Sequence, residues 1–214
     1  SIASIKCTPI SANAPPPFSL ELRNAPLIGA PRLRTHVQSP KLTLPRLPSR
    51  TLPRAAMYSA LKRSVWPEYN RDHPSMLGAF GLIDSDRIDR TVMDNTLQLV
   101  EECWKYPTLW GWDFAMMAMT AVRLGKPEKA IELLLKESPK NCYVTSGNNR
   151  QTGRKDLPLY LPGNGSLLLA AAIMAAGYDG CDRQTPGFPD DGQWIVEFEN
   201  IDPLPGTSPV SPID

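Results

Sequence analysis

The stretch GWDFAMMAMTAVRLGKPEKAIELLL, residues 111–135, decides the fold class. Its first half is apolar on nearly every side, which is typical of a buried helix, here over 112–124. Gly125 suits the position just after a helix, and Pro127 suits the first turn of the next one. Apolar residues then recur at helical spacing to the end of the stretch. The pattern therefore predicts a helical hairpin closed by a very short turn.

Two more helices are predicted, one on each side of this hairpin. The first covers about 86–104, where apolar side chains recur at helical spacing behind residues of N-cap type. The second is SLLLAAAIMAAG, 166–177, which Asn164 or Ser166 would cap. The segment 138–165 between the hairpin and this helix is predicted to be a loop, because Gly, Pro, Asn and Ser fill it.

A strand is predicted near the end of the sequence, where apolar and polar residues alternate over 194–199. With this strand, the body of the protein is mostly α, with helix pairs joined by aromatic-rich loops. About four or five helices can be counted in it from the pattern.

Charge and proline divide the chain of 214 residues into unequal parts. Residues 1–57 hold eight lysines and arginines against one acid, and 10 of the 23 prolines. The rest holds 15 basic and 21 acidic side chains, so the net charge of +1 conceals halves of +7 and −6. Because proline breaks helices and central strands, 1–57 is predicted to be a disordered arm. A targeting leader and a peptide for a partner domain stay open as alternatives for it.

The composition therefore predicts three parts: a Pro- and Arg-rich disordered arm over 1–57, a helical domain over 58–205 and a flexible tail over 206–214. No run of about 18 apolar residues occurs, and the net charge is small, so neither a membrane nor a nucleic acid is an expected partner. Four scattered cysteines lack metal or redox spacing, so no metal or cofactor is expected. The compartment stays open between secreted and cytoplasmic.

Three loop segments mix carboxylates, amides and aromatic rings. They are VWPEYNRDHPSMLGAFG from 65, TLWGWDF from 108 and SGNNRQTGRKDLPLYLPGNGS from 146. Sugars are bound by this mixture, because their C–H faces stack on aromatic rings and their hydroxyls need planar polar partners. Cleavage of a glycosidic bond adds two carboxylates, one protonated and one ionised.

The candidate residues follow from these segments. Asp113 and Asp72 are the candidate catalytic carboxylates, while Glu68 and Asp156 are further acids in the same loops. The candidate substrate-binding residues are Asn70, Arg71, His73, Trp110, Trp112, Asn148, Asn149 and Asn164. For Asp113, desolvation by aromatic neighbours would raise the pKa, while the helix N-terminus would lower it, so its role as acid or base stays open.

From about residue 70 to 204 the chain resembles the C-terminal part of six-hairpin glycosidases, whose catalytic domain is an α/α toroid. The resemblance lies in NRDHPSMLGAFG, WGWDFAMMAMTAVRLGKPEKAIELLL, SPKNCYVTSGNN, DLPLYLPGNGSLLLAAAIMAAG and the GFP segment before the Trp194 strand. It implies carbohydrate as the partner and glycoside hydrolysis as the activity. It also implies that Trp112 and Asp113 begin one inner helix and that Asn164 begins the next.

The chain departs from the family at two points. Fucosidase-like members have an aspartate just before the last Gly-Asn pair, where this chain has Pro162. The general acid of the family lies on an earlier hairpin, and nothing here matches that region. A toroid needs twelve helices, so the chain is expected to be an incomplete toroid, with self-association or a missing upstream half as ways to complete the site.

Two other functions remain as hypotheses. The segment AVRLGKPEKAIELL also reads like one tetratricopeptide-type helix pair, which would make the protein a helical-hairpin interaction module without catalysis. Such arrays repeat every 34 residues or so, and no second copy is found. The other hypothesis is a sugar-binding protein that has lost catalysis.

Overall fold

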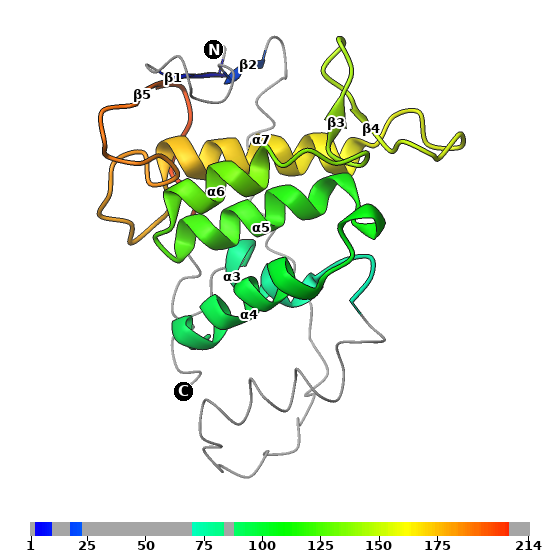
Figure 1. Cartoon of the computed structure of the whole chain (residues 1–214). Helices are drawn as coiled ribbons and strands as arrows, with labels where there is room; N and C mark the ends of the chain where they lie inside the picture. Colours follow the sequence, from blue (N-terminus) through cyan, green and yellow to red (C-terminus); the bar gives the residue numbers. More distant parts are fainter. Residues whose placement is uncertain (1–2, 10–17, 23–69, 84–87, 206–214) are drawn as a thin grey trace, which may run out of the picture.

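The computed structural model of the chain describes residues 3–9, 18–22, 70–83 and 88–205. This part of the chain is mostly helical, as predicted (Figure 1). Its α-helices are α3 (Gly78–Gly81), α4 (Arg90–Cys103), α5 (Gly111–Arg123), α6 (Pro127–Leu134) and α7 (Leu161–Ala176). Two short 3₁₀ helices, Ser75–Leu77 and Tyr106–Thr108, precede α3 and α5.

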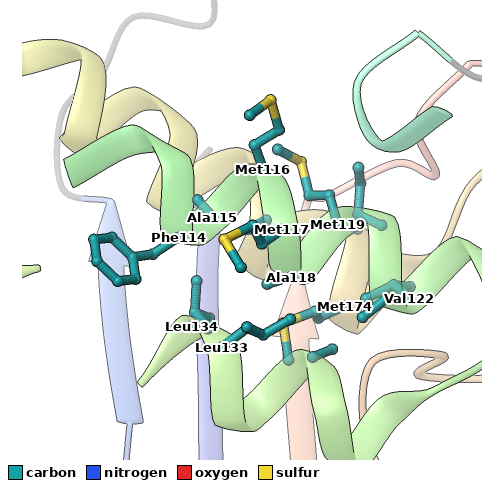
Figure 2. Packing of buried hydrophobic residues seen from close by; sticks show 14 of the residues in the cluster. Phe114, Ala115, Met116, Met117, Ala118, Met119, Val122, Leu133, Leu134 and Met174 are labelled. Carbon is teal, nitrogen blue, oxygen red and sulfur yellow. The ribbon is translucent and has the colours of Figure 1, made fainter. Parts of the chain in front are cut away.

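Helix α5 is the centre of the core. Of its 13 residues all but Trp112 are buried, because α3, α4, α6 and α7 all contact it. Figure 2 shows Met117 of α5 pointing toward Leu133 and Leu134 of α6, whereas Met116 and Met119 point to the opposite side of α5. All three methionines are buried, as is Met174 of α7. The predicted hairpin of two helices is confirmed. Its turn is tight: Gly125 takes φ +76°, and α6 begins two residues later at Pro127.

Helices α5 and α7 run side by side in the same direction, with α6 returning between them in the chain. The two helices contact each other extensively. Trp110 directly precedes α5 and Tyr160 directly precedes α7, and the rings of these two residues are 5.5 Å apart. The first turns of α5 and α7 therefore meet at one end of the bundle, beside the strand pair β3 (Cys142–Tyr143) and β4 (Asn149–Arg150) (Figure 1).

A three-stranded antiparallel sheet lies against α7 near its other end (Figure 1). Strand β1 (Ala3–Pro9) is central, between β2 (Phe18–Leu22) and β5 (Trp194–Glu199). The register pairs Cys7 with Val196, and Ile5 and Cys7 are both buried in the core. The predicted strand over 194–199 is confirmed.

The prediction that 1–57 holds no central strand is wrong for residues 3–9. The prolines of this segment are dense on average, but ASIKCTP carries one only at its last position. The strand also alternates correctly, with Ile5 and Cys7 buried and Lys6 between them exposed. Residues 10–17 and 23–57 lie outside the described part, as does the tail after 205.

Two helix boundaries also differ from the prediction. Helix α4 begins at Arg90, because the Asp89 carboxylate accepts the N–H groups of Thr91 and Val92 at 2.9 and 3.2 Å and caps it there. Helix α7 begins at Leu161, five residues earlier than expected.

Neither Asn164 nor Ser166 caps α7, since the N-cap residue is Tyr160. Pro162 lies in the first turn of α7, where the missing N–H of a proline is not needed. The predicted loop 138–165 thus holds the β3–β4 pair and the start of α7. No helix in the described part is long and apolar enough to span a bilayer.

Candidate functional site

The candidate site lies where the first turns of α5 and α7 meet. Its centre is Asp113, whose side chain is fully buried. One carboxylate oxygen accepts the backbone N–H of Trp110 at 2.7 Å, which ties the acid to the start of its own helix. His73 Nδ1 lies 3.0 and 3.1 Å from the two carboxylate oxygens. The fold thus brings His73 of the 70–73 segment into contact with Asp113, 40 residues further along the chain.

Burial raises the pKa of Asp113 to about 6. The N–H of Trp110 and the nearby His73 act against this rise, because both stabilise the carboxylate, while the negative charge of Asp72 adds to it. Of the two opposing effects that the sequence left open, desolvation is the larger. Asp113 therefore takes up a proton closer to neutral pH than an exposed aspartate does.

His73 connects the buried acid to the surface. Its side chain is 33% exposed, and its Nδ1 also lies 2.9 Å from the indole Nε1 of Trp112. The Nδ1 atom can donate to the Asp113 carboxylate in one tautomer or accept from the Trp112 N–H in the other. The tautomer of the His73 ring thus decides whether Nδ1 forms its hydrogen bond with the Asp113 carboxylate or with the Trp112 N–H.

Aromatic rings surround the His73–Asp113 pair. The ring of His73 lies 5.6 Å from that of Trp110 and 5.0 Å from that of Trp112. Tyr160, the residue before α7, places its ring 5.5 Å from Trp110. The Arg154 guanidinium lies over the Trp110 ring at 5.4 Å. We call these six residues, His73, Trp110, Trp112, Asp113, Arg154 and Tyr160, the aromatic cluster.

Asp72 lies at the exposed edge of the aromatic cluster. Its backbone is fixed at both groups: the N–H donates to Thr108 Oγ1 at 3.0 Å, and the carbonyl accepts from Trp104 Nε1 at 2.7 Å. These bonds hold it in the left-handed region, at φ 52°, which is uncommon for a residue other than glycine. One carboxylate oxygen is 3.4 Å from Trp110 Nε1. Asp72 is thus an exposed carboxylate in a fixed position next to the rings.

Asn149 is buried and belongs to the scaffold of the site. Its Nδ2 donates to the carbonyls of Lys140 and Cys142 at 3.2 and 3.3 Å. It is wedged between two glycines, because a Cβ on Gly111 or Gly163 would lie 2.1 or 2.5 Å from its Oδ1. Asn149 therefore holds the starts of α5 and α7 at a fixed spacing.

Asn164 fastens the neighbouring loop onto α7. Its Oδ1 accepts the N–H of Asn149 at 2.9 Å, and its Nδ2 donates to the carbonyl of Gly147 at 2.7 Å. Asn148 bonds locally, from Nδ2 to Ser146 Oγ at 3.0 Å. The asparagines of this loop thus take part in holding it in place.

Asn70 is likewise engaged within the protein. Its Nδ2 donates to the carbonyl of Cys103 at 2.6 Å, and its own carbonyl accepts the N–H of Lys105 at 2.9 Å. These bonds fasten the start of the 70–73 segment to the end of α4. Arg71, the next residue, is exposed.

Asp156 is exposed and paired with Arg154 through two contacts of 2.9 and 2.6 Å. The hydrogen bonds from Arg154 lower the pKa of Asp156 to about 2, so it does not suit the role of a protonated acid. Glu68 lies outside the described residues.

Four members of the aromatic cluster, His73, Trp110, Trp112 and Asp113, are candidate site residues from the sequence. The other two, Arg154 and Tyr160, are not. Tyr160 and Arg154 lie in the third of the loop segments, but their contact with Trp110 spans about 50 residues of chain. The glycines in WGW and GNG were the available signal, because Gly111 and Gly163 mark the close approach around Asn149.

Among the described residues, no group of three histidines, cysteines or acids is arranged to hold a metal ion. The four cysteines are unpaired, and burial raises the pKa of Cys7 to about 12, so this thiol is not a reactive one.

Comparison of the chain with family models, with curated proteins and with solved structures finds no match.

Proposed function

We propose that the aromatic cluster binds carbohydrate, within a domain built like the helical hairpins of six-hairpin glycosidases. The observation that carries the proposal is the gathering of Trp110, Trp112 and Tyr160 around His73 and Asp113 at one end of α5 and α7. Sugars need both parts of this arrangement, rings for their apolar faces and planar polar groups for their hydroxyls.

The helix order supports the same architecture. In a toroid of hairpins, each inner helix is followed by an outer helix that returns, so that successive inner helices run parallel and begin at the same end. Helices α5 and α7 have this relation, with α6 as the returning helix. The loops that precede inner helices then gather on one side, where a ligand can contact several of them at once.

The half-buried members of the aromatic cluster and the exposed Asp72 would make the contacts. Trp110 and Tyr160 are half-buried and would stack on the sugar, while Asp72 and His73 would bond its hydroxyls. Asp113 is enclosed and reaches the ligand only through His73. It is a positioning residue in this proposal.

We expect binding to be weak and turnover to be negligible. Glycoside hydrolysis needs two carboxyl groups on opposite sides of the scissile bond, about 5–5.5 Å apart for retention or 6.5–9.5 Å for inversion. Asp72 is exposed, but Asp113 is not, so the two do not face one substrate directly.

Isothermal titration with four oligosaccharides tests the proposal: maltoheptaose, cellohexaose, xylohexaose and mannohexaose. At least one should bind saturably. Tyr160→Ala should weaken that binding about tenfold, whereas Tyr160→Phe, which keeps the ring and removes the hydroxyl, should stay within twofold. The absence of binding by all four sugars, or equal loss in both variants, would refute stacking on this ring.

Activity assays on aryl glycosides of the same sugars test the expectation on turnover. Wild-type protein and Asp113→Asn should both give background rates. Robust turnover that Asp113→Asn abolishes would show instead that the catalytic pair is complete and includes Asp113.

A further inference from the structure

A cavity lies in the loop that follows α7, away from the aromatic cluster. It has a volume of about 430 Å³, within the range of small-molecule sites. Its polar walls are Arg183, Gln184, Thr185 and Asp190, and its aromatic walls are Phe188 and Trp194. The aromatic cluster begins at the start of α7 and this cavity follows its end, so the 16 residues of the helix, about 24 Å, separate them.

The loop that forms the cavity is fastened to the helix end. The N–H of Gly187 donates to the carbonyl of Met174 at 3.0 Å, and a Cβ on Gly187 would lie 2.2 Å from the Met174 side chain. The segment after β5 closes the loop, since the N–H of Leu204 donates to the carbonyl of Gly177 at 3.0 Å. The cavity is therefore formed before any ligand arrives, which lowers the cost of ordering on binding.

The two aromatic residues that line the cavity, Phe188 and Trp194, pack against each other and against the core. The rings of Phe188 and Trp194 lie 5.3 Å apart at 52°, and Phe188 is buried. Both rings also border an apolar crevice with Leu134 and Met174. Trp194 belongs to β5, so the sheet fixes its backbone while its half-buried ring faces the cavity.

Thr185 is strained at the same place. It takes φ 43°, and the left-handed region is energetically unfavourable for a β-branched residue. Strained backbone positions of this kind are frequent at ligand sites, where contacts with the surrounding structure hold the backbone in its unfavourable conformation. Here the strained residue, Thr185, lines the cavity.

The lining defines the chemistry of the ligand. Arg183 and Asp190 contribute one charge of each sign, so the walls favour no net charge on a ligand. The amide of Gln184 and the hydroxyl of Thr185 add hydrogen-bond donors and acceptors to the lining, and Trp194 adds a flat apolar ring. We propose that this cavity is a second carbohydrate-binding site, for a neutral sugar whose ring stacks on Trp194. The site stands on its own residues and does not depend on the aromatic cluster.

Protein NMR on the full chain tests the site, with the Trp194 indole N–H signal followed during titration with maltoheptaose, cellohexaose, xylohexaose and mannohexaose. At least one sugar should shift that signal saturably. Arg183→Ala and Asp190→Ala should each weaken the affinity read from it about tenfold. Both side chains are exposed, so thermal melting should confirm that the variants fold as the parent does.

Arg154→Ala is the matched control, because it removes an exposed arginine at the other end of α7. It should leave the affinity read at Trp194 unchanged, as should Trp110→Ala. A Trp194 signal that no sugar moves, or an affinity that Arg183→Ala and Asp190→Ala leave intact, would overturn the proposal. Because the readout is Trp194, failure here is distinct from failure of binding at Trp110.

Discussion

Asn149 shows how closely single residues are fitted at the candidate site. It sits between Gly111 and Gly163, with no room for a Cβ on either, and it receives the N–H of Tyr160 on its carbonyl at 3.0 Å. One buried amide thereby sets the spacing of two helices, and the positions of Trp110 and Tyr160 follow from that spacing.

We predict that Gly163→Ala destabilises the protein by about 1–3 kcal/mol, because the new methyl would overlap the Asn149 side chain. Gly165→Ala, two residues further along α7, has nothing within 4 Å of its added Cβ. It should be neutral or stabilise by up to about 1 kcal/mol, since alanine favours helix. Urea unfolding of both variants measures this. Equal stabilities would mean that the glycine at 163 is not required.

Asp113 predicts a pH dependence of stability. Its pKa is raised from 3.8 to about 6 in the folded protein, so between these values the folded state keeps a proton that the unfolded state releases. The free energy of unfolding therefore falls as pH rises from about 4 to about 6, by up to about 1.4 kcal/mol per pH unit.

Asp113→Asn removes this titration and keeps an oxygen for the Trp110 N–H. Measured by urea unfolding, the stability of this variant relative to wild type should rise from pH 4 to pH 6 and level off above that. A difference that stays constant over this range would show that burial does not raise the pKa of Asp113.

At the scale of elements, the central position of α5 makes the hairpin sensitive to charge. Met119 is fully buried, so Met119→Asp places an unpaired carboxylate in the core, at a cost of several kcal/mol. We expect this variant to lose its cooperative thermal transition. Met119→Leu, which conserves volume, should cost less than about 1.5 kcal/mol. If Met119→Asp melts like the parent, α5 is not the buried helix described above.

The hairpin and the last strand could be predicted because their signals are local. An apolar run, a glycine after it and a proline two residues later fix α5 and α6, and alternation fixes β5. The sequence pattern predicts α7 too short, because Pro162 and Gly163 are residue types that are typical of loops. Only the packing of Gly163 on Asn149, 14 residues away in sequence, explains a glycine inside the first turn.

The candidate site could be predicted only in part, because it also depends on contacts between residues far apart in the sequence. His73 and Asp113 are 40 residues apart, and sequence showed only that both lie in aromatic-rich loops. Their contact depends on the 70–73 segment being fastened to the end of α4, which no local pattern shows. The burial of Asn149 likewise follows from the tertiary structure, and its residue type alone does not predict it.

At the scale of the whole molecule, the sheet joins the start of the described chain to its end. Strand β1 pairs with β5 across about 190 residues, and no periodicity can predict such a partner. The pairing buries Ile5 and Cys7 and places Trp194 at the cavity that follows α7. The core therefore extends beyond the helices.

Adjacent residues of β1 test this extension. Ile5→Ala should destabilise the protein by about 2–5 kcal/mol, because Ile5 is buried. Lys6→Ala, on the opposite face, removes only an exposed pair with Glu197 at 3.8 Å and should cost about 0–1 kcal/mol. Thermal melts compare the two. Equal melting temperatures would show that β1 is not part of the folded core.

The central claim is that the aromatic cluster at the start of α5 and α7 binds carbohydrate. The most direct measurement follows the indole N–H signals of Trp110 and Trp112 by NMR during titration with the four oligosaccharides. The account predicts a saturable shift of both signals with at least one sugar, and about a tenfold weaker affinity, read at Trp112, in Trp110→Ala but not in Trp194→Ala. Signals that no sugar moves, or an affinity that Trp110→Ala leaves unchanged, would contradict it.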